Sequence, residues 1–169
     1  MPPSAQAASP AGMYFKDDGT ILYVADLSGY FQQYTISTAW DITTASYASK
    51  NLNVNSQDTA PTGLVFNPDG TKMYLTGYGS GSVHSYSVST AWDISTASYD
   101  SISLNIYSYT NLPRGLTFEQ DGATLFIAGQ GTDVVIKFNS ATLKTISGIQ
   151  VKLQYKERYK NKAGILSYN

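Results

Sequence analysis

The stretch PTGLVFNPDGTKMYLTG, residues 61–77, decides the fold, because it reads as two strands joined by an Asp-Gly turn. Leu64 and Phe66 are two residues apart and therefore share one face of an extended chain. Asp-Gly between such runs is a strong hairpin signal, since Gly adopts a positive φ at little cost. The run KMYLTG is apolar on both faces, which is typical of a central strand covered on two sides.

This pattern occurs three times along the chain. PAGMYFKDDGTILYVAD begins at residue 10 and PRGLTFEQDGATLFIAG at residue 113, so the Asp-Gly pairs recur at steps of 51 and 52 residues. The turn glycines are Gly19, Gly70 and Gly122. Small residues follow the second strand of each unit, and third and fourth strands are expected after them. Each unit therefore predicts four antiparallel strands.

A repeated four-stranded unit of this length is the signature of a β-propeller blade. We expect an all-β repeat region over residues 1–145, with three blades at about 10–60, 61–112 and 113–145. PDGTKMYLTG also resembles the core of YVTN-type propeller repeats. A three-sheet β-prism is the alternative fold. Residues 146–169 are expected to form a C-terminal strand and basic tail that completes blade three or docks a partner.

A second repeated stretch connects the third and fourth strands of the first two units. It reads STAWDITTASY from residue 37 and STAWDISTASY from residue 89, which agree at ten of eleven positions. Trp40 and Trp92 are predicted to be buried plugs that pin the connection onto its blade. Asp41 and Asp93 are predicted to accept backbone N–H bonds in an Asx turn or a short helical turn.

The tryptophan and aspartate pairs allow a second interpretation, in which they form a sugar-stacking site. We favour the structural plug, because two copies of one local folding problem require no ligand. The third unit has Lys144 where the tryptophan is expected.

Composition excludes several classes of function. A net charge of −1 gives no field that would favour nucleic acid or a membrane surface. No apolar run approaches the roughly 18 residues of a membrane helix, and the start MPPSAQAASPAGMYF does not read as a secretion signal. The chain has no Cys and one His, His84, which we interpret as a surface or core residue. We therefore expect no metal site, no cofactor and no enzyme activity.

Charge is distributed unevenly along the chain. Residues 1–139 contain five Lys or Arg against eleven Asp or Glu, whereas residues 140–169 contain six against one. A basic tail on an acidic body favours docking to an acidic neighbour, including another copy. The alternative is that the lysines solubilise an edge strand.

Three blades are fewer than the 4–8 of typical propellers, so two apolar sheet faces need a cover. We expect an oligomer or a larger assembly, with residues 149–169 at the contact.

The repeats resemble a propeller-like repeat of bacteriophage and other viral structural proteins, in which AWDISTASY-type and PDGTKMY-type segments alternate. The resemblance covers roughly residues 6–139. It implies a non-enzymatic phage tail or virion surface module, made in the host cytoplasm without a signal peptide, whose partners are itself or other virion proteins. The alternative is a host-attachment module that binds a glycan or receptor. The candidate ligand-binding residues are Tyr30, Phe31, Tyr78, Tyr107 and Tyr109.

Overall fold

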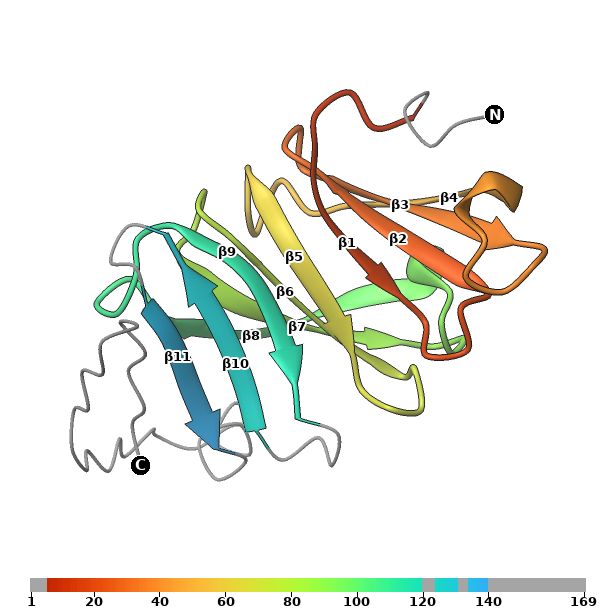
Figure 1. The fold of residues 1–169 in the computed structure, drawn as a ribbon. Coiled ribbons are helices and arrows are strands. Elements are labelled where there is room, and N and C mark those ends of the chain that lie inside the picture. The colour runs from red at the N-terminus through yellow and green to blue at the C-terminus, as the bar shows by residue number, and fades with distance from the viewer. Residues whose placement is uncertain (1–5, 120–123, 131–133, 140–169) are drawn as a thin grey trace.

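The computed structural model describes residues 6–119, 124–130 and 134–139, which form three antiparallel sheets (Figure 1). Blade 1 contains β1 (Pro10–Phe15), β2 (Ile21–Asp26), β3 (Tyr30–Ile36) and β4 (Ala45–Asn53). Blade 2 contains β5 (Pro61–Phe66), β6 (Lys72–Gly77), β7 (Ser82–Val88) and β8 (Ala97–Asn105). Blade 3 contains β9 (Pro113–Phe118), β10 (Thr124–Gly129) and β11 (Val134–Asn139).

Strands pair in chain order within every blade, as the sequence predicts. The sheet orders are β1-β2-β3-β4, β5-β6-β7-β8 and β11-β10-β9. The three blades lie side by side, with β5 between β1 and β9 (Figure 1). The predicted all-β propeller-like fold is therefore confirmed, in preference to the β-prism. The predicted fourth strand of blade 3 and the predicted tail at residues 146–169 lie outside the described residues.

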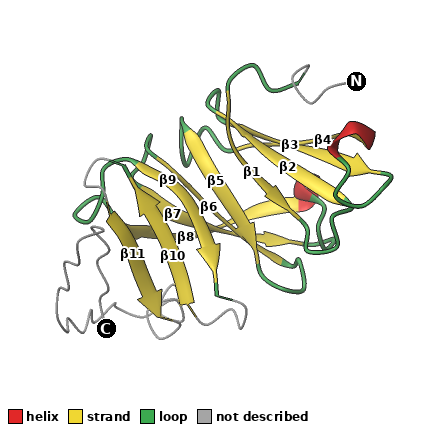
Figure 2. Ribbon diagram, viewed as in Figure 1, coloured by secondary structure: helices red, strands yellow, loops and turns green. Residues whose placement is uncertain are grey.

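Helical structure in the described residues is limited to two short 3-10 turns, η2 (Ile42–Thr44) and η3 (Ile94–Thr96) (Figure 2). These are the short helical turns predicted after Asp41 and Asp93. None of the described residues belongs to a helix long and apolar enough to cross a membrane.

Each sheet has two faces, which we name by the neighbour that they meet. The front face of a blade points toward the preceding blade and carries Leu64 and Phe66 in blade 2. The back face points toward the following blade and carries Tyr23 and Ala25 in blade 1. Front and back residues of adjacent blades together form the two inter-blade cores, because neither face can bury its apolar side chains alone.

The Asp-Gly turns have the predicted geometry wherever the structure describes them. Gly19 and Gly70 have φ values of 72° and 74°, in the left-handed region that favours glycine. The Asp69 carboxylate accepts hydrogen bonds from the Thr71 N–H at 2.8 Å and from its hydroxyl. Gly122 lies outside the described residues.

A buried carboxylate joins the start of blade 1 to the turn between β2 and β3. Asp26, at the end of β2, accepts the N–H of Ser9 at 3.1 Å and the N–H of Ser28 at 2.8 Å. The carboxylate therefore satisfies backbone groups of two segments that otherwise have no strand partner there.

Blade 2 satisfies the equivalent N–H groups with a carboxylate from a different segment. Asp58, in the linker between β4 and β5, accepts the N–H of Ala60 at 2.8 Å and the N–H of Gly79 at 3.2 Å. Gly77 occupies the position of Asp26, and a Cβ there would lie 2.5 Å from Asp58 Oδ1. Ala7 occupies the position of Asp58 and is buried.

Candidate functional site

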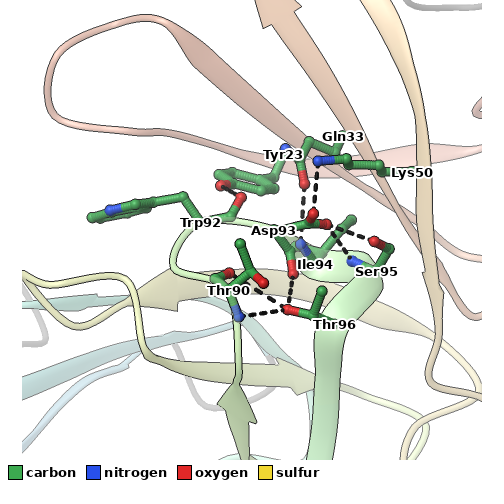
Figure 3. Close-up of polar contacts among 9 residues, drawn as sticks. All are labelled: Tyr23, Gln33, Lys50, Thr90, Trp92, Asp93, Ile94, Ser95 and Thr96. Carbon is green, nitrogen blue, oxygen red and sulfur yellow. Dashed lines mark hydrogen bonds and ion pairs between the residues drawn. The ribbon is translucent and has the colours of Figure 1, made fainter.

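The candidate site is the interface that blade 2 makes with blade 1 through its tryptophan segment, which we define as residues 89–96. The equivalent tryptophan segment of blade 1 is residues 37–44. Figure 3 shows the blade 2 segment crossing to the back face of blade 1. The Tyr23 hydroxyl donates to the main-chain oxygen of Trp92 at 2.6 Å. The Ile94 N–H donates to Gln33 Oε1 at 3.0 Å, and Ile94 is completely buried.

Asp93 uses both carboxylate oxygens to hold this segment. One oxygen accepts the Ser95 N–H at 3.1 Å and the Ser95 hydroxyl at 2.6 Å, and the other lies 2.7 Å from Lys50 Nζ on blade 1. Burial alone would raise the pKa of Asp93, but the hydrogen bonds from Lys50 and Ser95 outweigh it and lower the pKa. An ionised Asp93 therefore links the turn of its own blade to the neighbouring blade.

A threonine pair fixes the remainder of the segment (Figure 3). The Thr90 N–H donates to Thr96 Oγ1 at 3.0 Å, and Thr96 Oγ1 donates to the main-chain oxygen of Asp93 at 2.9 Å. These local bonds hold the segment in the conformation that meets blade 1.

Trp92 adopts a positive φ of 66°, which is uncommon outside glycine and which the sequence did not indicate. Its N–H donates to the main-chain oxygen of Gly70 at 3.1 Å, and the indole lies on that turn and 5.1 Å from the Phe66 ring. Lys16 of blade 1 places its Nζ 5.5 Å from the indole centroid. Trp92 packs against the core between blades 1 and 2 but is only partly buried, so the prediction of a buried plug is confirmed in part.

Trp40 does not act as a buried plug, and the prediction of its burial is wrong. It makes the same N–H bond to its own turn, with Gly19, at 3.1 Å, and its ring lies 5.4 Å from that of Phe15. The side chain is nevertheless 60% exposed. The physical reason is the missing neighbour. The back face of blade 1 covers Trp92, whereas no described blade precedes blade 1 to cover Trp40 in the same way.

Asp41 has the predicted local role. It accepts the Thr43 N–H at 3.0 Å and the Thr43 hydroxyl at 2.6 Å, and these bonds lower its pKa. Among the described residues Asp41 forms no ion pair, whereas its equivalent Asp93 is paired with Lys50.

The front face of blade 1 thus contains an open copy of the interface. Met13 is 72% exposed where the equivalent Leu64 of blade 2 is 4% exposed. Ile42 is 45% exposed where the equivalent Ile94 is 0% exposed. We call Met13, Trp40 and Ile42 the open patch. The remainder of this front face is buried in a cluster that includes Ala7 and Leu22.

The aromatic residues predicted to bind a ligand do not converge on one surface. Phe31 is fully buried between blades 1 and 2, and Tyr109 packs edge-on against Phe138 in the core between blades 2 and 3. These two side chains stabilise the fold.

The other three candidates lie near the turns and linkers at one end of the blades. The Tyr30 hydroxyl accepts a hydrogen bond from Asn53 Nδ2 at 3.0 Å. Arg114 lies over the Tyr78 ring at 4.9 Å, and Tyr107 is exposed. The Tyr30 contact lies within blade 1 and the Arg114 contact with Tyr78 joins blade 3 to blade 2, so these contacts connect none of the three candidates with another and indicate no shared binding site.

A polar cluster in blade 2 was not predicted from the sequence. Ser80 Oγ lies 2.6 Å from Asp58 Oδ2 and 3.0 Å from His84 Nε2. Burial lowers the pKa of His84, and the Asp58 carboxylate opposes this shift. His84 Nδ1 is buried without a hydrogen-bond partner among the described residues. No group of three His, Cys, Asp or Glu that could hold a metal occurs in the part of the chain that the structure describes.

Sequence reasoning found the tryptophan segments but not the surface that receives them. Lys16, Lys50 and Gln33 come from blade 1, where they have no repeated counterpart in blade 2. Tyr23 was visible as a repeated aromatic, but nothing in the sequence connected it to residue 92.

No family model and no curated protein sequence matches the chain. Solved structures do match. A Bacteroides uniformis protein provisionally named a 6-phosphogluconolactonase has a TM-score of 0.57 at 17% identity, over 82% of this chain and 39% of that one. The periplasmic gluconolactonase of Pseudomonas aeruginosa has a TM-score of 0.56 at 16% identity, over 90% of this chain and 44% of that one.

A Desulfotomaculum acetoxidans protein of unknown function also matches, with a TM-score of 0.56 at 16% identity over 95% of this chain and 41% of that one. At these identities the likeness establishes the fold. The chain spans about two fifths of the length of these proteins.

The comparisons overturn the predicted function. The predicted virion structural module is wrong, because two of the matched solved structures are named as gluconolactonases, which are enzymes. The alternative of a glycan- or receptor-binding adhesion module finds no support among them. That this chain is not an enzyme, and its resemblance to phage repeats, stay predictions that nothing here tests. The chain's likeness to these structures lies in its stack of antiparallel blades, which is the β-propeller fold.

Proposed function

We propose that this chain supplies three consecutive blades of a closed β-propeller and that the front face of blade 1 binds a further blade. The contrast between equivalent residues carries the proposal. Met13 and Ile42 are exposed, whereas Leu64 and Ile94 at the same positions of blade 2 are buried by blade 1. These two positions occur in both blades and are covered only in blade 2, which favours a second contact of the same kind at the open patch.

The size of the fold supports this proposal. Propellers typically carry 4–8 blades, since each blade covers the face of its neighbour around a ring. The chain covers only 39–44% of the gluconolactonase-named structures that it matches. A ring of that kind therefore needs blades beyond the three described here.

Oxidation of Met13 by hydrogen peroxide, read by mass spectrometry, tests the proposal. Met73 is fully buried between blades 1 and 2 and is the internal control. In dilute protein Met13 should oxidise readily and Met73 should not. At concentrations where the protein associates, the oxidation of Met13 should slow toward that of Met73.

A variant sharpens the experiment. Ile42→Asp should leave the unfolding temperature of the dilute chain almost unchanged, because the side chain is already half exposed. It should prevent association, because a buried unpaired carboxylate is costly. A chain that stays monomeric with Met13 fully reactive at every concentration contradicts the proposal.

A second candidate function is the hydrolysis of a sugar lactone. The specific observation in its favour is the contact of Ser80 with both His84 and Asp58, which pairs a hydroxyl with a base and a carboxylate. The names of two matched structures point to the same reaction class. In the observed arrangement Ser80 donates to Asp58, so activation by His84 would require the hydroxyl to rotate.

Hydrolysis of gluconolactone and 6-phosphogluconolactone, followed by acid release against the spontaneous rate, tests this candidate. Activity should fall in Ser80→Ala and His84→Gln and persist in Ser46→Ala, an exposed control on β4 of blade 1. A rate equal to the spontaneous rate with both lactones rules this function out.

A further inference from the structure

We propose that the blade which binds the open patch is blade 3 of a second copy of this chain, so that two chains close head to tail into one ring. This inference rests on the proposed function and adds the identity of the partner. Among the described residues, the back faces of blades 1 and 2 are covered by the following blade, and neither inter-blade core includes the back face of blade 3.

The same cross-strand pair of positions lies on the back face of every blade, because the second and third strands pair in the same register. A residue of the second strand pairs with a residue of the third, and both point backward. The pairs are Tyr23 with Gln33, Tyr74 with Ser85, and Phe126 with Lys137. Blade 3 therefore presents Phe126 and Lys137 where blade 1 presents the two side chains that bind the Trp92 segment.

The aromatic contacts of the two existing interfaces follow one rule. The second-strand aromatic of each back face packs on the first-strand Phe of the next front face. The ring centroids are 4.8 Å apart for Tyr23 with Phe66 and 5.2 Å apart for Tyr74 with Phe118. Phe126 is the next back-face aromatic, and Phe15 is the front-face Phe of blade 1. The rule pairs Phe126 of one copy with Phe15 of the other.

Charge follows the same rule. At the described interface a cation from the back face, Lys50, neutralises Asp93, and Lys16 lies near the indole of Trp92. Blade 1 has Asp41 and the exposed Trp40 at the equivalent positions. Among the described residues, no lysine or arginine forms an ion pair with Asp41 or lies over the Trp40 ring.

Lys137 meets this need from the back face of blade 3. It lies at the position of Gln33, whose Oε1 reaches the N–H of Ile94, the residue next to Asp93. A lysine is longer than a glutamine, so from this position its ammonium group can reach the carboxylate at the position of Asp93, which is Asp41 in the second copy. In the described structure Lys137 lies 5.9 Å from its own Phe126 ring, so the charge stands on the docking face.

Two copies give six blades, within the 4–8 of known rings. Contacts of this head-to-tail kind form a closed ring when the rotation between copies closes. A two-chain ring then contains two identical contacts, each joining Asp41 of one copy to Lys137 of the other. The net charge of −1 per chain opposes this association only weakly.

Charge reversal tests the pairing through the mass in solution, measured by sedimentation. Asp41→Lys alone would set two lysines against each other, and Lys137→Asp alone would set two aspartates against each other. Each single variant should self-associate roughly tenfold to a hundredfold more weakly than the unaltered chain. An equimolar mixture of the two variants should restore association as a one-to-one complex, because both of its contacts then join opposite charges.

A matched control separates this pairing from a change in net charge. Glu119 is exposed, so Lys137→Asp with Glu119→Lys has the same net charge as Lys137→Asp with Asp41→Lys. Only the latter double variant should associate as the unaltered chain does.

The inference is overturned if the single variants associate normally, if their mixture does not, or if the control double variant does. Protection of Met13 from oxidation without any effect of the charge variants would keep the proposed function and refute this partner. Met13 reactivity that never changes would refute both.

Discussion

Replacing Ile94 by Ala tests the claim that the same isoleucine position is covered in blade 2 and open in blade 1, because Ile42 provides the matched control. The two residues follow Trp and Asp in the same repeated stretch, and they differ in exposure, at 0% and 45%. Ile94→Ala removes three carbon groups from a closed interface. At about 0.8 kcal/mol each this is about 2.4 kcal/mol, and the cavity left behind raises the loss to about 3–4 kcal/mol.

Ile42→Ala removes the same atoms from a half-exposed site that can leave no cavity. Its cost in the dissociated chain should be about 1 kcal/mol or less. Urea unfolding of dilute protein gives both free energies, and thermal unfolding should show a loss of roughly 6–15 °C for Ile94→Ala. Equal losses in the two variants, or a loss below about 1 kcal/mol for Ile94→Ala, would refute the assignment of the interface.

Gly70→Ala should lower the free energy of unfolding by more than about 1 kcal/mol, because φ is +74° and the new Cβ would lie 2.4 Å from the Trp92 ring. Gly115→Ala is the control and should change thermal stability little, because a Cβ there meets nothing within 4 Å. Similar melting temperatures for the two variants would contradict this. The folded-state pKa of Asp93 is lowered, so its contribution is present above the unfolded value near 3.8 and is lost as pH falls through the folded value. Urea midpoints of Asp93→Asn should therefore decline less than those of the unaltered chain between about pH 5 and pH 2, and parallel curves would argue against the role of the carboxylate. Tyr23→Phe should cost about 1 kcal/mol in calorimetry by leaving the Trp92 main-chain oxygen without its donor, and an unchanged transition would show that this bond contributes nothing.

The sequence predicts the fold well because its strongest signals are local. Leu64, Phe66 and the Asp-Gly turn that follows them specify a hairpin through alternation and glycine geometry, and both operate over a few residues. Repetition then multiplies this signal, so that blades 1 and 2 could be drawn strand by strand.

The site was predicted only in part, because its essential contacts join residues far apart in the chain. Asp93 binds Ser95 two residues away, and the Asx turn was predictable for that reason. Lys50 lies 43 residues from Asp93, and Gln33 lies 61 residues from Ile94. No pattern within one repeat reveals such partners, since they belong to the junction between repeats.

Trp40 shows the same limit from the other side. Its local sequence is that of Trp92, yet its exposure differs because a neighbouring blade, and not the repeat itself, decides burial. Identical residues in two repeats therefore specify backbone conformation more reliably than they specify burial.

Blade 1 takes its buried carboxylate from Asp26 and blade 2 takes it from Asp58, at a different position of the repeat. This difference has a consequence for repeat engineering. Averaging the blades position by position into one consensus unit would combine the two solutions. Such a unit could carry an acid at both positions, forcing two negative charges into one pocket, or at neither, leaving the N–H groups of the linker and the turn unsatisfied. Idealised arrays derived from this chain should keep the two positions linked, as Ala with Asp or Asp with Gly, and never choose them independently.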